Sequence, residues 1–213
     1  MMFKPEEREY RNFASFEIRK DEEAKEIVTG YASTFDEYVL RDLGDEVWTE
    51  RISPNAFDEA DMSDVVFLRD HAGQVFARTK NGTITITADA KGLLTRTDLS
   101  RTSGARQMYE DIAAENYTQM SFGFIVSKQH FEEEQRDDKV LIHRVIDGIK
   151  KVFDISAVAF PANPTTEIST VTRAAFDGGI EELRAERLEA RKAENQRARE
   201  ALMLKLKMEE LKQ

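Results

Sequence analysis

The alternation of apolar and polar residues predicts a chain built mostly of strands. Runs that alternate, or that are rich in β-branched and aromatic residues, are typical of strands. One hairpin is predicted across Asp89-Ala90-Lys91-Gly92, because this turn contains a glycine that can adopt a positive φ. The acidic segment 36–46 and the charged segment 132–138 are predicted as loops. The predicted strands cover residues 27–35, 47–52, 65–68, 83–87, 93–99, 120–127, 140–146 and 151–160.

Two shorter segments carry helical signals. Ser53-Pro54-Asn55-Ala56-Phe57 places a serine cap before a proline at the first helical position, which predicts the start of a helix. Residues 103–116 predict a second helix, capped by Ser103, that turns Met108 and Ile112 inward. Many strands with few helices predict an α+β or closed β-barrel domain.

The two ends of the chain differ from its middle. Residues 1–20 are polar and of mixed charge, which predicts a flexible N-terminal arm or a loosely held first strand. After Asp177-Gly178-Gly179, residues 180–213 contain no proline or glycine and predict one long helix. Its eight acidic and nine basic residues predict either a solvated helix or partly disordered tail, or a helix that binds a partner or a second copy. The chain is thus divided into an arm (1–20), a folded domain (21–175) and a charged helical tail (176–213).

Composition narrows the functional classes. The net charge is −10 over 213 residues, and phosphate neutralisation needs a basic surface, so a nucleic-acid partner is not expected. No cysteine is present, which excludes disulfides and thiolate metal sites. The sequence has no run of about 18 apolar residues, and its charged N-terminus lacks the apolar core of a signal peptide. Neither a membrane partner nor secretion is therefore expected.

Two separated residues suggest a base and a nucleophile that folding brings together. His71 follows the buried run 65–68, and a neutral imidazole at the rim of a core suits a general base. The alternative is a solvated loop histidine. Ser121 lies in Gln119-Met120-Ser121-Phe122-Gly123-Phe124, although most strand serines are structural. Gly123 on the same face would let a substrate backbone approach, while the two phenylalanines anchor the opposite face.

A third residue is needed to orient the base. Asp154 interrupts the apolar stretch 152–160, and a carboxylate there is costly without a partner. Its partner is either a lysine, an arginine or backbone N–H groups, or the Nδ1–H of His71, which would complete a nucleophilic triad. His143 on a predicted strand is the alternative third member. Asp70 is discounted, because adjacent strand residues point to opposite faces.

Metal and cofactor sites are not expected. His130-Phe131-Glu132-Glu133-Glu134 has the wrong order for an HExxH zinc motif, and no second histidine follows at the required spacing. The sequence also lacks a glycine-rich phosphate loop and a dinucleotide fingerprint. The candidate chemistry is therefore that of side chains alone.

In order and spacing, these motifs resemble the HK97-type prohead (capsid maturation) proteases of tailed bacteriophages, which are related in fold to herpesvirus assemblin proteases. The resemblance runs from about Gly30 to Ile168, roughly two-thirds of the chain. It implies an α+β fold, mainly an antiparallel β-barrel with a few flanking helices, followed by a long C-terminal helix. The segments that carry it are Gly30-Tyr31-Ala32 with Phe35, Ile52-Ser53-Pro54-Asn55-Ala56-Phe57, Leu68-Arg69-Asp70-His71, Lys91-Gly92-Leu93 before Leu99, Met120-Ser121-Phe122-Gly123-Phe124, and Phe153-Asp154-Ile155-Ser156-Ala157-Val158 with Phe160-Pro161-Ala162-Asn163-Pro164.

The resemblance implies a serine protease in which Ser121 is the nucleophile and His71 is the base. In the phage family an acidic residue precedes a Ser-x-Val element ahead of the Pro-Ala motif, and Asp154 takes this place. The herpesvirus relatives use a second histidine instead, which His143 would imitate.

The oxyanion of the acyl-transfer intermediate needs preorganised donors. The backbone N–H groups of residues 161–166 and the side chain of Arg144 are the two candidates. Neither is singled out by the sequence pattern.

The resemblance also implies a substrate and a place. The substrates would be the scaffold, or the scaffold-like N-terminal segment of the major capsid protein, cut inside the procapsid in the host cytoplasm. Self-cleavage and self-association would accompany this, and the tail after Gly178-Gly179 is a candidate for procapsid targeting and self-removal. A non-catalytic capsid assembly or scaffolding protein that retains the fold is the alternative, although the intact His71 and Ser121 favour the protease.

Overall fold

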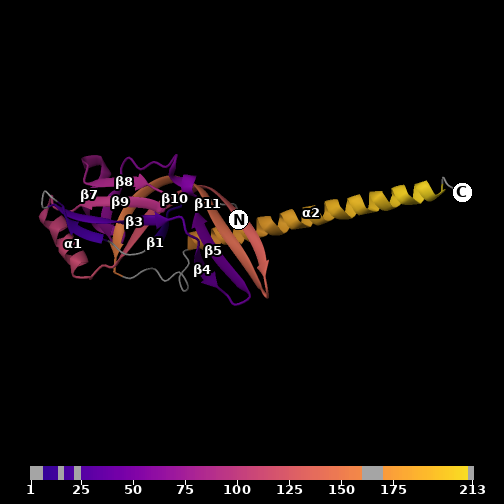
Figure 1. The fold of residues 1–213 in the computed structure, drawn as a ribbon, viewed down its shortest axis with the longest axis horizontal. Helices are drawn as coiled ribbons and strands as arrows, with labels where there is room; N and C mark the ends of the chain where they lie inside the picture. Colours follow the sequence, from indigo (N-terminus) through magenta and orange to yellow (C-terminus); the bar gives the residue numbers. More distant parts are fainter. Residues whose placement is uncertain (1–6, 14–16, 22–24, 160–169, 211–213) are drawn as a thin grey trace.

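The chain folds into an α+β structure with two β-sheets, seen in a computed structural model that describes residues 7–13, 17–21, 25–159 and 170–210 (Figure 1). The described residues contain few helices. They are α1 (Ser103–Ala113), α2 (Thr170–Glu210) and the short 3-10 helices η1 (Pro54–Phe57) and η2 (Thr79–Asn81).

The larger sheet is organised around its long strand β11. Its main order is β1-β10-β11-β5-β4, while β6 pairs with β11 further along and β7 pairs with β6. β10 and β11 form an antiparallel hairpin, whereas β5 and β6 each run parallel to β11. The strands are β1 (Glu9–Phe13), β4 (Tyr38–Asp42), β5 (Glu46–Ile52), β6 (Val66–Arg69), β7 (Ala72–Arg78), β10 (Gln119–Arg136) and β11 (Lys139–Val158).

The smaller sheet is antiparallel in the order β2-β3-β9-β8. One apolar core joins this sheet to the larger sheet and to α1, and it includes Val28, Leu93, Met108, Phe122 and Ile155. The strand pairs of the described residues form two separate sheets and do not close into a barrel. The α+β class is therefore confirmed, whereas the expected barrel is not observed. The strands are β2 (Glu17–Lys20), β3 (Glu26–Thr34), β8 (Ile84–Ala88) and β9 (Gly92–Asp98).

The long C-terminal helix α2 projects away from the sheets (Figure 1). Its first turns are packed: the Phe176 ring stacks on Trp48 with centroids 4.6 Å apart and meets the edge of Phe131 at 5.4 Å. Gly179 lies inside the helix, where an added Cβ would come within 2.3 Å of the Phe131 ring. The helix thus starts at Thr170, before the two glycines, and not after them as predicted. Because Gly179 has no side chain, the helix can approach the Phe131 ring closely at this position.

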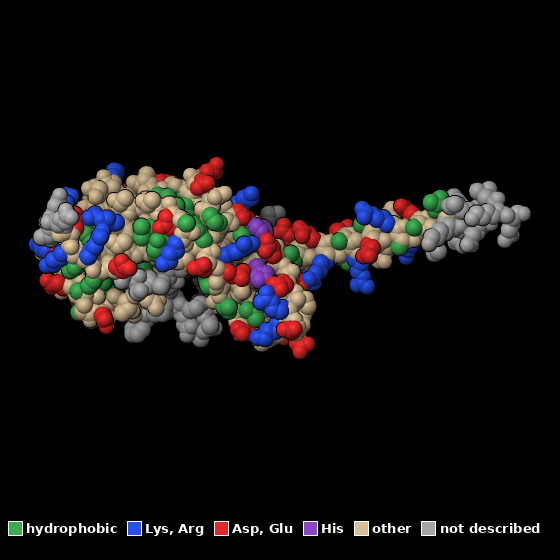
Figure 2. Space-filling view, viewed as in Figure 1, with side chains coloured by type: hydrophobic (Ala, Val, Ile, Leu, Met, Phe, Trp, Pro, Cys, Tyr) green, Lys and Arg blue, Asp and Glu red, His purple; other side chains and the backbone are tan. Residues whose placement is uncertain are grey.

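Beyond Leu183 the helix becomes solvent-exposed. Residues 184–201 are exposed without interruption. Lysines and arginines are interspersed with acidic side chains along the visible face of this segment (Figure 2). Such a surface is typical of a solvated helix, because it offers water both signs of charge and little apolar area.

Two predicted loops contain strands. The segment predicted as an acidic loop holds β4, where Tyr38 and Leu40 pack into the cluster around Trp48 and Phe176. The charged segment 132–138 continues β10 and β11 as a two-stranded ribbon, which turns between Arg136 and Lys139. The two strands predicted for 140–146 and 151–160 are consequently one strand. β7 was not predicted, because four of its seven residues are exposed and leave no apolar pattern.

Smaller differences concern the helices and the N-terminal arm. The helix expected from Ser53 is a single 3-10 turn. α1 is capped by Thr102, whose Oγ1 accepts from the Ala105 N–H at 3.1 Å, and not by Ser103. Within the segment predicted as an arm, residues 9–13 form β1, which pairs with β10, and residues 17–20 form β2, which pairs with β3.

Candidate active site

Three neighbouring strands of the larger sheet carry the candidate site. β10 and β6 lie on either side of β11 and both pair with it. Ser121 of β10 is opposite Ser156, and Gly123 is opposite Asp154. Directly opposed residues share a face of the sheet, and so do residues two apart on one strand. Ser121 and Asp154 therefore project from the same face, two residue pairs apart along the ladder.

The opposite face of β10 anchors the strand in the core. Phe122 and Phe124 are fully buried, and their rings stack with centroids 4.4 Å apart. The alternation predicted for this segment thus holds: the phenylalanines fill the core while Ser121 and Gly123 face the site.

His71 reaches the site from a tight turn. Arg69 of β6 pairs with Ala72 of β7, so Asp70 and His71 are the two residues of a hairpin loop. Both have positive φ, 48° and 59°, which is the pattern of a type I′ turn and is uncommon for residues other than glycine. The Asp70 N–H donates to the Ala157 carbonyl of β11 at 3.0 Å, which holds the turn against the site strands. Holding His71 in this conformation, with its imidazole directed at the site, therefore costs on the order of 1 kcal/mol of backbone strain.

The imidazole of His71 lies between the carboxylate and the hydroxyl. Its Nδ1 is 2.5 Å from Asp154 Oδ1, and its Nε2 is 2.7 Å from Ser121 Oγ. Ser121 is 0% exposed, Asp154 1% and His71 19%. An ionised carboxylate only accepts hydrogen bonds, so the proton belongs on Nδ1 and leaves Nε2 free to accept the Ser121 proton.

Asp154 has further neighbours that support its charge. Ser156 Oγ donates to the same Oδ1 at 2.8 Å. Arg8 Nη1 lies 3.8 Å from Oδ2, which has no hydrogen-bond partner among the described residues. The Arg8 guanidinium also lies 3.8 Å above the Phe153 ring. The carboxylate is thus held by two hydrogen bonds on one oxygen and a nearby cation on the other.

The other histidines lie elsewhere. His143 Nδ1 contacts Thr49 Oγ1 and Glu37 Oε1, each at 2.8 Å, and so does not meet His71. His130 lies on the ribbon and pairs with Asp147 at 2.5 Å, a hydrogen bond that raises the pKa of His130. Of the two candidates for the third member, Asp154 and His143, only Asp154 is in contact with His71.

The N-terminal strand β1 covers this site. It pairs with β10 so that Tyr10 is opposite Gly123 and Asn12 is opposite Ser121. The Tyr10 ring lies on the His71 imidazole with centroids 4.2 Å apart. A Cβ on Gly123 would come within 2.8 Å of the Tyr10 ring and 2.4 Å of Asp154 Oδ2. The glycine expected to admit a substrate backbone thus makes room for two of the chain's own side chains, the Tyr10 ring and the Asp154 carboxylate.

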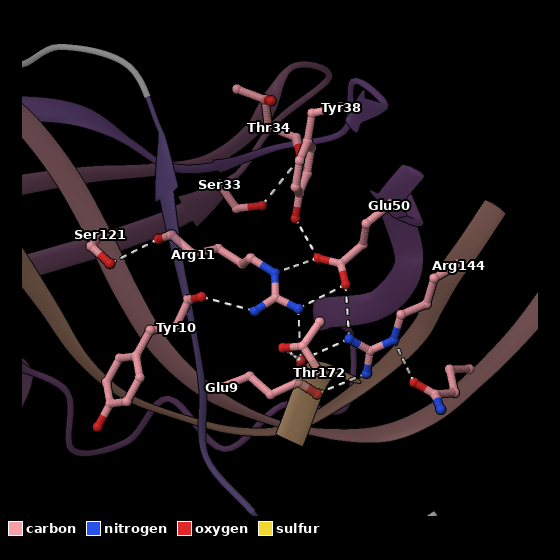
Figure 3. A network of polar contacts seen from close by, with 11 residues as sticks. Glu9, Tyr10, Arg11, Ser33, Thr34, Tyr38, Glu50, Ser121, Arg144 and Thr172 are labelled. Atoms are coloured by element: carbon pink, nitrogen blue, oxygen red, sulfur yellow. Dashed lines mark hydrogen bonds and ion pairs between the residues drawn. The ribbon is translucent and has the colours of Figure 1, made fainter. Parts of the chain in front are cut away.

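The carbonyl group of Arg11 contacts the nucleophile. Ser121 Oγ lies 2.9 Å from the Arg11 carbonyl oxygen (Figure 3). A hydroxyl has one proton, so Ser121 donates either to Arg11 or to His71, not to both. The bound carbonyl therefore competes with the base for the proton that catalysis would move.

The side chain of Arg11 enters a buried ionic network (Figure 3). Its Nε and Nη2 donate to the two carboxylate oxygens of Glu50 at 2.5 and 2.8 Å. Arg144 donates to Glu50 at 2.8 Å and to both oxygens of Glu9 at 2.7 Å. The Tyr38 hydroxyl also donates to Glu50. Four charged side chains are thus paired inside the domain.

These pairings determine the protonation states of the carboxylates. Burial alone would raise the pKa of Glu9, but Arg144 and Arg11 outweigh it and hold this pKa well below its usual range. Glu50 follows the same pattern: burial opposes ionisation, and Arg11 and Arg144 lower its pKa overall. Both carboxylates are therefore ionised acceptors at neutral pH.

The network was missed by the sequence analysis. One signal was available in the sequence. Glu50 lies in a correctly predicted strand among residues that are buried, and a buried carboxylate needs a charged or hydrogen-bonding partner. Arg144, a candidate oxyanion donor, gives its hydrogen bonds to Glu9, Glu50 and Gln129. Figure 3 places it at the opposite end of the network from Ser121. The other oxyanion candidate, the backbone of residues 161–166, lies outside the described residues.

Metal-binding clusters and membrane-spanning helices are not seen in the described part of the chain. Within it, no group of three or more histidine, aspartate or glutamate side chains could hold a metal ion. None of its helices is both long enough and apolar enough to span a membrane.

Comparison with known proteins gives one match. A family model described as Caudovirus prohead serine protease matches residues 14–177, which is more than half of the chain. No curated protein and no solved structure matches the sequence. The matched region contains His71, Ser121 and Asp154, whereas β1 precedes it.

Proposed function

Because the chain belongs to the caudovirus prohead serine protease family, we propose that it is an active serine endopeptidase of phage procapsid maturation. Ser121 is the nucleophile, His71 the general base and Asp154 the acid that orients His71. The observation that carries the proposal is the unbroken contact from Asp154 through His71 to Ser121, at 2.5 and 2.7 Å.

The first half of the reaction forms an acyl-enzyme. His71 Nε2 takes the Ser121 proton as Oγ attacks the carbonyl carbon of the scissile peptide bond. Asp154, bonded to Nδ1–H, stabilises the imidazolium that results. When the tetrahedral intermediate collapses, the imidazolium gives its proton to the leaving amine nitrogen and the C–N bond breaks. The N-terminal part of the substrate is then an ester on Ser121.

The second half uses water. His71, again neutral, takes a proton from a water molecule whose oxygen attacks the ester carbonyl. Collapse of the second intermediate breaks the C–Oγ bond, and the proton returns to Ser121. The overall reaction consumes one water and needs no cofactor.

The substrates in this proposal are structural proteins of the procapsid. We assign the scaffold, or the scaffold-like segment of the major capsid protein, together with the chain itself. The protease would act inside the procapsid in the host cytoplasm. The exposed part of α2 suits a segment that targets the chain to the procapsid and is later removed, because residues 184–201 are exposed and lie outside the core.

The alternative is a capsid assembly protein that has lost catalysis. It would have no need to hold His71 in a left-handed backbone conformation between an acid and a hydroxyl. That geometry favours the protease.

Intact mass spectrometry tests the proposal. Wild type and Ser121→Ala would each be expressed alone and with the matching capsid protein. Truncation products that appear in wild type and are absent in Ser121→Ala support a serine protease. Full-length chains in all four samples, together with no reaction of wild type with a fluorophosphonate, would support the non-catalytic alternative.

A further inference from the structure

The strand β1 lies in the candidate site in the way that a peptide substrate would. We propose that the buried pocket around Glu50 is the subsite for an arginine that contributes the scissile carbonyl, and that Arg11 occupies it here as an internal stand-in. The inference rests on the proposed function, because it assigns the substrate preference of the same site.

The first argument is the position of the Arg11 carbonyl. Its oxygen is 2.9 Å from Ser121 Oγ, so this peptide group is adjacent to the nucleophile. A substrate bound in the same register would place its scissile carbonyl here. The residue that carries this carbonyl in β1 is an arginine.

The second argument is the alternation of β1. Glu9 and Arg11 project to one side, where both are buried in the ionic network. Tyr10 projects to the other side and lies on the His71 ring and over Gly123. Extended peptides bound to a sheet edge use main-chain hydrogen bonds for affinity and pockets for alternate side chains for specificity. β1 has both features along the edge of β10.

The third argument is the chemistry of the pocket. Glu50 is 0% exposed and presents both carboxylate oxygens to Arg11 in a two-point contact. This fork geometry matches a guanidinium, and lysine cannot reproduce it. Arg144 Nη1 also donates to Glu50 Oε2 at 2.8 Å. When Arg11 is displaced, the Glu50 carboxylate therefore keeps one hydrogen-bond partner until a substrate arginine binds. Arg144 also binds Glu9, which adds a preference for an acidic residue two positions before the arginine.

The resident strand keeps the enzyme latent. Ser121 is 0% exposed under β1, and the Arg11 carbonyl competes for its proton. A substrate must displace β1, which competes as part of the same chain and so at high effective concentration. The family match begins after β1, at residue 14, so the covering strand is an addition to the matched region.

The test uses the full-length chain and the rate at which a fluorophosphonate labels Ser121. Competitors are the peptide aldehydes acetyl-Glu-Tyr-Arg-al, its norleucine counterpart and its lysine counterpart. We expect the arginine aldehyde to protect Ser121 at a concentration at least about tenfold lower than either of the others, a preference worth about 1.4 kcal/mol. Equal protection by all three overturns the subsite, while labelling that is lost in Ser121→Ala still supports the protease. No labelling of either wild type or Arg11→Ala, in which β1 is held less tightly, overturns the proposed function and the subsite together.

Variants locate the preference. Two pocket variants are compared: Glu50→Gln removes the carboxylate, and Tyr38→Phe keeps it. In both, the preference for the arginine aldehyde over the other two aldehydes should fall at least threefold. Arg11→Ala should raise the labelling rate of the uninhibited chain at least fivefold, because β1 is held less tightly. Arg78→Ala, which loses the distant ion pair with Asp64, is the matched control and should label at the wild-type rate. Unchanged preference in both pocket variants, or unchanged labelling of Arg11→Ala, would overturn the assignment.

Discussion

Replacing Asp154 by asparagine separates the two candidates for the residue that orients His71. Asp154 Oδ1 accepts hydrogen bonds from His71 Nδ1 at 2.5 Å and from Ser156 Oγ at 2.8 Å. An amide has one acceptor and one donor end where the carboxylate has two acceptors. The substitution changes few atoms, so the fold should be preserved while the proton positions change.

Neither orientation of the amide suits this site. If its oxygen faces His71, the NH₂ group takes the place of Oδ2, 3.8 Å from the cationic Arg8 and without a described hydrogen-bond partner. If the amide is flipped, its NH₂ faces His71 Nδ1, which must then accept, so that the ring proton moves to Nε2. The imidazole can no longer take the proton of Ser121. The loss of the orienting acid in serine triads costs on the order of 10³–10⁴ in rate, or about 4 to 5.5 kcal/mol of barrier.

The assay is the second-order rate of fluorophosphonate labelling at pH 7. We expect Asp154→Asn to label at least about 10³-fold more slowly than wild type. His143→Ala is the matched control and should stay within threefold, since His143 contacts Thr49 and Glu37 instead of the site. A tenfold loss or less in Asp154→Asn, or a large loss in His143→Ala, would refute the assignment of Asp154. Far-UV circular dichroism and a thermal melt check that each variant is folded.

Three further outcomes follow from the structure. The pKa values of Glu9 and Glu50 are lower in the folded chain than their ordinary value of 4.5, so the stability they contribute is present above that pH and is lost as pH falls below it. Urea midpoints should thus drop between pH 7 and pH 3, by less in Glu9→Gln, and a rise would contradict the network. Phe176→Ala should destabilise the chain by about 3 kcal/mol in urea unfolding, since the ring is fully buried between two aromatic side chains, and a change under 1 kcal/mol would mean that the base of α2 is not held there. If the arginine subsite is correct, self-cleavage of the tail should occur after Arg184 and Arg191, which follow glutamates at the spacing of Glu9 and Arg11, and intact masses that fit neither cut would exclude these sites.

The parts of the fold predicted correctly are those whose apolar residues signal burial locally. β3 and β9 are buried or half-buried along their whole length, and Ile84 and Ile86 of β8 alternate with exposed threonines, so all three strands were recognised. β7 and the outer part of β10 expose most of their side chains, so an apolar strand pattern was absent, and in segment 132–136 the charge suggested a loop. Their strands are stabilised by main-chain pairing, which depends on the partner strand and not on the residue's own side chain.

The site was predictable where a residue conflicts with its own surroundings. Asp154 in an apolar run signals a partner, and the structure supplies His71 and Ser156. Arg11 gives no such signal, because it lies in a polar segment and its partner Glu50 is 39 positions away. The contact between β1 and β10 is also distant in sequence, so the covering of Ser121 could be found only in three dimensions.

The helix α2 determines how far the folded domain lies from the far end of that helix. It has 41 residues, which at a rise of about 1.5 Å each gives a rod of about 60 Å. A flexible linker of the same length would have a typical end-to-end distance of only about 35 Å and no preferred direction. Phe176 is packed between Trp48 and Phe131, so the rod leaves the domain at a set angle. A partner bound at the tip of the rod would therefore lie at a fixed distance and direction from the candidate site, and cleavage within the rod would remove this constraint.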